Sequence, residues 1–548
     1  MKKIYIFCLF AHSLLHLYGQ QANDELIFKA MHDEMQRNAT QLELPEKPRP
    51  FFLSYTYGHY RNFEVTGVLG SVVRSFASPE TSAGAVQLLL GNYSHTSDGS
   101  YSNPLIHQKM PSTADYDAIR RNYWLASDKM YKYALQLEMQ KESVRKASPL
   151  SSEEKDLPDL ERVASVRKIV ERNGKFDINQ TELEKIACEL SALFKEYKKI
   201  ENSVVMISGF SSDIYKQTSE DVVLKQPNSL VSLVVQGNVM TDDGTIIQDV
   251  FSLQVDTPAS LPSIDELKKE VRAFADNLMS LREAQPIDEY YSGPVLLEDG
   301  ACSSMFISNL LYKGGLLAFR KPIGNNASYG LGERLGDKII DSRITVTNCT
   351  DMKEYKGMPL WGAYEIDAEG VVPKAQTVLI EKGMLKGLLN GCIPSPYAPH
   401  STGSSRFLLA PANYAYTTAP GVVHIQADKT TKQGKMKKAL LKAARKEGLK
   451  HAYIVRKVAE NASLVYQTDV ETGREILVRN VSISPIGLDK MEDMAEISSE
   501  EHAFNYVWNG QVFSSFIGPR SVLLKNIKIT KGNSQAEKKP VLTFPLER

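Results

Sequence analysis

Apolar and polar residues alternate in several short segments of the first half of the chain, and a two-residue period is typical of β-strands. This pattern predicts strands within the runs FFLSYTYG, FEVTGVLGSVVRSF and GAVQLLLGNYS. It also predicts a hairpin over LVSLVVQGNVMTDDGTIIQDVFSLQV, with its turn at Asp242-Asp243-Gly244, because a glycine accepts the positive φ of a tight turn.

Other segments place apolar residues at helical spacing. Helices are predicted over Asn23–Asn38, Tyr116–Lys146, Val163–Glu171, Thr181–Ile200 and Ser263–Glu283. The last begins with a serine followed three positions later by a glutamate, which is the pattern of a capping box. The charged stretch ASPLSSEEKDLPDLE, which contains two prolines and three serines, is predicted to be a linker.

The pattern of predicted elements changes after Pro286, where short strands and glycine turns become dominant. We place a domain boundary near residues 285–290, since 548 residues exceed the size of most single cores. The predicted fold class is α+β. An N-terminal α/β domain with long helices over a sheet covers residues 21–287, and a β-rich C-terminal domain covers residues 288–548.

The chain begins with two lysines, an apolar run from Ile4 to about Leu17, and small residues near Gly19. These features predict a signal peptide over residues 1–20, cut between Gly19 and Ala22. No later segment is apolar for long enough to form a transmembrane helix. We therefore expect an exported protein without an integral membrane segment, periplasmic or extracellular in a Gram-negative bacterium.

Four cysteines remain after the predicted cut, namely Cys188, Cys302, Cys349 and Cys392, and no two form a CxxC pair. This spacing excludes a disulfide scaffold and a zinc knuckle. The sequence leaves open one long-range disulfide or, as we expect, buried free thiols. Cys302 at a helix start is a candidate nucleophile, but no histidine lies within thirty residues to act as its base, so we expect a small buried residue.

Lysine plus arginine and aspartate plus glutamate each total 65, so the protein has no net charge to attract nucleic acid. The one dense basic run spans Lys429–Lys450. Its apolar residues fall on one helical face, which predicts a helix docked on the protein with its lysines in solvent. No nucleic-acid partner is expected.

Six segments in the second half occur in a characteristic order, and with them the chain resembles the TldD/PmbA family, once described as modulators of DNA gyrase. The segments are GPVLLEDGA, RITVTNCTD, GAYEIDAEGVVPKAQTVLIEKGMLKGLLN, HSTGSSRF, GREILVRN and SFIGPRSVLLKNI. RPFFLSYTY and YWLASDKMYKYAL in the first half are similar to the exported branch of that family. The resemblance implies the two-domain fold given above and dimers that enclose a cleft.

TldD-type members of the family carry HExxxH on the helix after the GPVL strand and a downstream cysteine, which together hold zinc for peptide hydrolysis. In the register we favour, Ile307–Tyr312 stands where HExxxH would be, and no cysteine follows Cys392. The resemblance therefore implies that this chain has no catalytic residue and no metal or other cofactor of its own. Zinc would belong to an HExxxH-bearing TldD-like partner, since the PmbA type lacks the motif and pairs with such a subunit.

The loop YAPHSTGSSRF is one that the family keeps near its cleft. The residues predicted to hold a peptide there are His400, Ser401, Thr402, Gly403 and Arg406. A solvated surface loop is the alternative for His400, and Arg406 would either pair with a carboxylate terminus or anchor the loop.

The predicted function is that of a metallopeptidase-family pseudoenzyme. It would be the zinc-free subunit of a peptide-processing dimer, with a TldD-like partner or a second copy of itself, or a peptide binder. The alternative is an active metallopeptidase acting through an unrecognised site. Glu298, Asp299, Asp367 and Glu369 would supply oxygen ligands in that case, although acidic residues at strand ends are more often turn formers.

Overall fold

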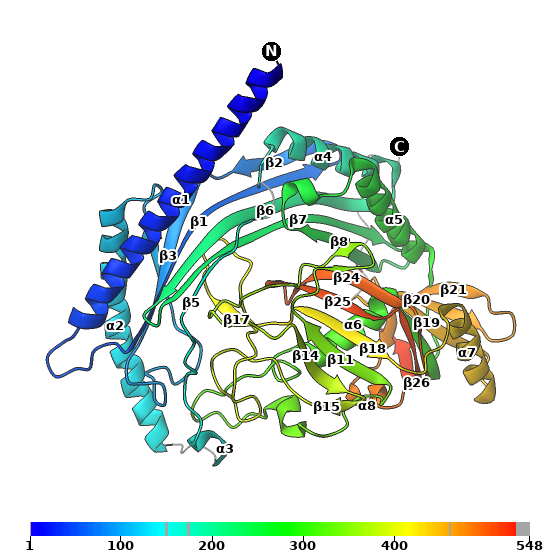
Figure 1. Ribbon diagram of the computed structural model, residues 1–548. Coiled ribbons are helices and arrows are strands. Elements are labelled where there is room, and N and C mark those ends of the chain that lie inside the picture. Colours follow the sequence, from blue (N-terminus) through cyan, green and yellow to red (C-terminus); the bar gives the residue numbers. More distant parts are fainter. Residues whose placement is uncertain (1, 148–151, 173–175, 460–461, 533–536, 538–548) are drawn as a thin grey trace.

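The computed structural model describes residues 2–147, 152–172, 176–459, 462–532 and 537. Its fold class is α+β with a β-rich C-terminal region, as predicted. Figure 1 shows long curved strands arching over the C-terminal half of the chain. Among the described helices, none combines the length and apolar character of a membrane span.

The arch is an eight-stranded sheet with the order β4-β3-β1-β6-β7-β5, to which β2 and β8 add at β1 and β7. All its pairs are antiparallel except β5 with β7. The strands are β1 (Phe52–Val68), β2 (Ser71–Ala77), β3 (Thr81–Leu89), β4 (Ile106–Met110), β5 (Val166–Ile169), β6 (Ile200–Thr218), β7 (Val222–Met240) and β8 (Ile246–Val255). The predicted hairpin is confirmed as β7 and β8, and Gly244 in its turn has a φ of 84°.

Helices cover the sheet in two groups, α1 (Lys2–Gln41) with α2 (Tyr116–Ala147), and α4 (Gln180–Ala192) with α5 (Ile264–Glu283). In the first group, Met31 and Met130 pack with Tyr55 of the sheet. In the second, apolar residues of α4 and α5 share a core with β6 and β7. The predicted capping box at Ser263 is confirmed, because its side chain accepts from the Glu266 N–H and the Glu266 carboxylate accepts in return.

Two of the predicted elements need correction. The helix expected over Val163–Glu171 is wrong, since Val166–Ile169 forms the strand β5 and pairs in parallel with Val222–Lys225 of β7. The helix expected over Thr181–Ile200 ends early: α4 gives way to a 3-10 turn at Leu193–Glu196, and β6 begins at Ile200.

Part of the predicted linker, residues 148–151, lies outside the described residues. The rest contains α3 (Ser152–Lys155), and Asp159 and Leu160 near the end of the stretch are buried, at 5% and 8% exposure. The predicted signal peptide falls on a segment whose side chains lie outside the described residues, so it stays a prediction.

The C-terminal half contains two sheets. The first has the order β22-β26-β10-β19-β20-β21-β9 with β23 beside β26, and the second has the order β15-β14-β11-β18-β25-β24. The strands of the first are β9 (Gln285–Pro286), β10 (Tyr291–Glu298), β19 (His451–Lys457), β20 (Leu464–Asp469), β21 (Glu475–Arg479), β22 (Val481–Ile483), β23 (Glu496–Ile497) and β26 (Ser521–Lys531). Those of the second are β11 (Ile344–Cys349), β14 (Gln376–Glu381), β15 (Met384–Leu385), β18 (Val422–Ala427), β24 (Glu501–Trp508) and β25 (Val512–Pro519).

The helix α6 (Asp299–Leu310) contacts strands of both C-terminal sheets, and its Phe306 is fully buried in their shared core. The basic run forms α7 (Gln433–Lys446), and Met436, Leu440 and Ala444 are buried against the first of these sheets. The docked helix predicted for Lys429–Lys450 is thus confirmed. The remaining short elements are α8 (Leu488–Met491), the pairs β12 (Glu354–Tyr355) with β13 (Met358–Pro359) and β16 (Ser405–Phe407) with β17 (Tyr416–Thr418), and 3-10 turns at Pro258–Ser260 and Gly330–Arg334.

Candidate functional site

The helix α6 follows β10 directly, as the resemblance to the TldD/PmbA family implies. Three of its polar side chains form hydrogen bonds to backbone carbonyls of the protein. Ser303 and Ser308 donate to carbonyls of their own helix, and the Asn309 amide donates to the carbonyls of Met305 and Ile486. Because these hydroxyl and amide donors already have acceptors in the protein, they are not available to donate to a ligand.

The register that placed Ile307–Tyr312 opposite HExxxH does not fit a helical motif. α6 ends at Leu310, and Tyr312 lies in the turn beyond it. The absence of HExxxH does not depend on that register, because no histidine occurs anywhere between Tyr291 and Lys313.

Arginines hold both carboxylates at the junction of β10 and α6. Arg456 Nε lies 3.0 Å from Glu298 Oε2, and Arg520 Nε lies 2.8 Å from Asp299 Oδ1. A guanidinium bound this closely competes with any metal cation for the same oxygens. Within the described part of the chain, no three side chains of histidine, cysteine, aspartate or glutamate are placed to hold a metal ion.

Cys302 is fully buried, and its thiol donates to the carbonyl of Pro519 at 3.2 Å. Burial raises the pKa of this thiol well above its ordinary value, so the thiolate needed for nucleophilic attack is suppressed. The expected small buried residue is confirmed, and all four cysteines after the predicted cut are free.

A second carboxylate pair, Asp367 and Glu369, lies at the boundary between the arch and the C-terminal sheets. Asp367 is fully buried and accepts from the backbone N–H groups of Glu369, Val371 and Ser405, which is the turn-forming role expected of such residues. Burial, together with the neighbouring Glu369 carboxylate, raises the pKa of Asp367 to about 7.

Glu369 Oε2 accepts from the Cys392 N–H at 2.7 Å and from the Ser405 hydroxyl at 2.5 Å. Lys216 of β6 crosses the boundary and donates to the carbonyl of Ala368 at 2.7 Å. These hydrogen bonds join the two halves of the chain through buried polar groups. A buried polar network holds its parts in one relative position when each member has a hydrogen-bond partner.

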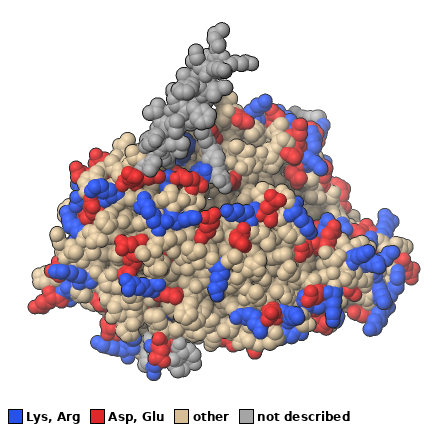
Figure 2. Space-filling model, viewed as in Figure 1, with Lys and Arg blue, Asp and Glu red and all other residues tan. Residues whose placement is uncertain are grey.

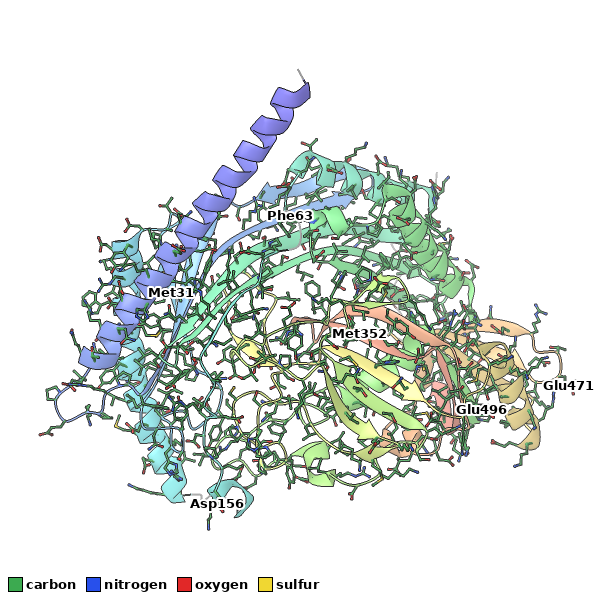
Figure 3. All side chains as sticks on the ribbon, viewed as in Figure 1. Met31, Phe63, Asp156, Met352, Glu471 and Glu496 are labelled. Carbon is green, nitrogen blue, oxygen red and sulfur yellow. The ribbon has the colours of Figure 1, made fainter. Side chains whose placement is uncertain are left out.

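Two cavities lie at this boundary, and Glu369 lines one of them. A cavity of about 290 Å³ is lined by Glu369 with Tyr101, Arg320, Tyr416 and Trp508, and a second of about 250 Å³ is lined by Arg406. Side chains fill the remaining space between the arch and the C-terminal sheets (Figure 3). No local pattern in the sequence predicts this convergence, because Tyr101 and Arg320 line the cavity from segments far apart in the chain.

The structure places the predicted peptide-cleft residues at the same boundary. The side chain of His400 is 82% exposed and lies 3.2 Å from a carboxylate oxygen of Glu161, whose second oxygen accepts from the Ser401 N–H at 2.6 Å. Thr402 donates its hydroxyl to the carbonyl of Asn390, and the Gly403 carbonyl accepts from the hydroxyl of Tyr364. Only Arg406 among the five lines one of the described cavities, so the loop is anchored while that one side chain faces an open space.

No single-sign charge field covers the face shown in Figure 2, where lysines and arginines are interspersed with aspartates and glutamates. The mixed charges on this face agree with the balanced composition of the chain.

The fold and the site define the class of protein first: an α+β protein with a β-rich C-terminal region, in which the helix after β10 carries no histidine. Residues 294–531 match the family model described as the PmbA/TldA metallopeptidase C-terminal domain. For the C-terminal region, this match confirms the resemblance to the TldD/PmbA family seen in the sequence.

Solved structures extend the likeness to most of the chain. TldE from Thermococcus kodakarensis is 13% identical, with a TM-score of 0.54 over 91% of this chain and 100% of that one. Proposed modulators of DNA gyrase from Thermotoga maritima and Bacteroides thetaiotaomicron are each 12% identical, with TM-scores of 0.54 and 0.53 over 87% and 92% of this chain and 96% and 98% of theirs. At this identity the likeness concerns the fold alone. A comparison with curated proteins found no match.

Proposed function

We propose that this protein binds peptides at the boundary between its halves and acts as the zinc-free subunit of a peptide-processing pair. The observation that carries the proposal is the arginine-held junction of β10 and α6. There the helix offers no histidine, and the two carboxylates are bound by Arg456 and Arg520. Such a chain has the strand and helix on which the zinc site of the family is built, but at this place it lacks imidazole ligands for zinc and a free base to polarise water.

The partner in the proposal is an HExxxH-bearing TldD-like chain, or a second copy of this chain where it acts only as a peptide binder. The ligand would be an unstructured peptide, because both large cavities lie between the arch and the C-terminal half and are lined by polar and apolar groups together.

Export is part of the proposal. Cleavage between Gly19 and Ala22 would leave the described contacts of α1 with the sheet in place, because they are made by residues after the cut. Asp24 bonds to Tyr215 and Lys225 of the arch, and Ile27 is fully buried.

The deciding experiment begins with elemental analysis of the mature protein, purified alone and without a histidine tag. We expect no stoichiometric zinc and no cleavage of unstructured peptides by the isolated chain. Cleavage should appear when an HExxxH-bearing partner is added, and a partner with that glutamate changed to glutamine serves as the control. About one zinc per chain, with chelator-sensitive cleavage by the chain alone, would refute the proposal and support an active peptidase with an unrecognised site.

A further inference from the structure

Arg406 lies on β16 and faces the 250 Å³ cavity between this strand and β7 of the arch. Its guanidinium stacks on the ring of Tyr364, with 4.0 Å between the guanidinium carbon and the ring centroid. The Tyr364 hydroxyl is in turn fixed by donating to the Gly403 carbonyl at 2.8 Å. Stacking leaves the edge of a guanidinium, where its N–H groups point, available to an acceptor.

The charge of Arg406 is poorly compensated by the protein. Its one hydrogen bond runs to the Gly362 carbonyl at 3.5 Å, and none of the described carboxylates lies within ion-pair distance of it. The other arginines of this boundary differ, since Arg172, Arg320 and Arg479 have a carboxylate oxygen at 3.0, 3.3 and 2.7 Å. Burial accordingly lowers the pKa of Arg406, which means that its charged form lacks the partners that would offset its lost hydration.

The walls of the cavity indicate the chemistry of the missing partner. Phe407, Leu409, Val512 and Phe513 provide apolar surface beside the guanidinium. Glu171, Asp256 and Arg172 also line the cavity, and Arg172 is already paired with Asp213 at 3.0 Å. The two carboxylates disfavour a multiply charged anion such as phosphate. A single carboxylate next to an apolar group satisfies both features.

The volume sets how much of a ligand enters. A cavity of about 250 Å³ is smaller than the roughly 300–1,000 Å³ of pockets that enclose a whole drug-sized ligand. It therefore suits the end of a longer molecule.

We propose that Arg406 binds the C-terminal carboxylate of a peptide, with the apolar side chain of the last residue against Phe407 and Phe513. The carboxylate would take two parallel hydrogen bonds from the guanidinium, the strongest geometry available to this pair. This inference rests on the proposed peptide-binding function and names the part of the peptide that is recognised.

The test is isothermal titration calorimetry of the mature protein with three N-acetylated peptides that differ only at their C-terminal residue or group. The first ends in leucine with a free carboxylate, the second is its C-terminal amide, and the third is an amide that carries an aspartate in place of the last leucine. The variants are Arg406→Met, which keeps the apolar stem, Arg406→Lys, which keeps the charge without the fork, and Arg445→Met on α7 as a matched control. Thermal unfolding of each variant checks that it is folded.

We expect amidation to weaken binding to the wild type and to Arg445→Met by about 10- to 100-fold, the range for a hydrogen bond to a charged group. Amidation should have no effect in Arg406→Met and an intermediate effect in Arg406→Lys. Equal binding of the free acid and the amide to the wild type would overturn the role of Arg406 while leaving peptide binding intact. Binding of the aspartate amide as tight as that of the free acid would overturn the assignment to the peptide terminus. Absence of binding by every peptide would instead count against the proposed function itself.

Discussion

Asp24 holds the first part of α1 on the arch, and the change Asp24→Asn should loosen that helix. Its Oδ2 lies 2.6 Å from Lys225 Nζ, and its Oδ1 accepts a 2.6 Å hydrogen bond from the Tyr215 hydroxyl. The Lys225 side chain is only 2% exposed. Its other carboxylate neighbour, Glu171, lies at 3.6 Å and is itself 71% exposed. The substitution therefore leaves a buried ammonium group without its close counter-ion.

Removing one partner of a buried ion pair destabilises a protein by about 3–5 kcal/mol. Because Asp24 retains 14% exposure and Glu171 remains nearby, we expect a loss just below this range, about 2–3 kcal/mol. If α1 opens locally, its amides should then exchange with solvent about 30- to 160-fold faster, since each 1.36 kcal/mol is a factor of ten.

Hydrogen exchange measured by mass spectrometry on peptides covering residues 22–41 tests this expectation. The control is Lys29→Met in the same helix, where Lys29 pairs with Asp33 at 2.5 Å but its side chain is 67% exposed. An exposed pair contributes about 0.2–1 kcal/mol, so exchange in the control should rise by about fivefold or less. An effect of Asp24→Asn no larger than the control would refute the anchoring role.

Three further predictions concern the boundary and the cysteines. Gly391→Ala should lower the free energy of unfolding by about 1–3 kcal/mol, because the added Cβ would lie 2.4 Å from the Ser405 hydroxyl oxygen, whereas Gly434→Ala, with no atom within 4 Å, should not destabilise the protein in urea denaturation. The raised pKa of Asp367, about 7 against an ordinary 3.8, means that the folded chain keeps a proton that the unfolded chain has lost. The contribution of this proton to stability is complete below about pH 4 and lost as the pH rises through 7. The stability of the wild type relative to Asp367→Asn should therefore fall by up to about 1.4 kcal/mol per pH unit over this interval. A difference that stays constant with pH would contradict the assignment. Of the four cysteines after the predicted cut, Cys188 alone is partly exposed, so a thiol reagent at pH 8 should modify one thiol per native chain and the other three only after denaturation.

The sequence predicted those parts of the fold that depend on local pattern. The capping box at Ser263 and the turn at Gly244 were predictable, because each is set by residues within a few positions of one another. The strand β5 was not, since Val166–Ile169 is held by pairing with Val222–Lys225, more than fifty residues away. A short apolar run with mixed spacing does not reveal such a partner.

The candidate site divides in the same way. The absence of histidine from the helix after β10 and the place of Arg406 in the HSTGSSRF loop can be read directly from the sequence. The pairing of Glu298 with Arg456 joins residues 158 positions apart, and that of Asp299 with Arg520 joins residues 221 apart. Only the folded chain shows that these acidic residues already have cationic partners.

These pairs also bear on the proposal that the chain holds no zinc. Reintroducing histidines on α6 alone would leave two guanidinium groups within 3.0 Å of the nearest carboxylates, and a divalent cation would have to displace or tolerate them. The junction therefore disfavours a divalent cation through its arginines as well as through its lack of histidine. At the boundary between the two halves the charges are not paired in this way. No described carboxylate pairs with Arg406, and an anionic ligand would neutralise its charge. A chain that disfavours the metal at one place and lacks an anion at the other is suited to holding a peptide for hydrolysis by another subunit, which is the division of labour that we propose.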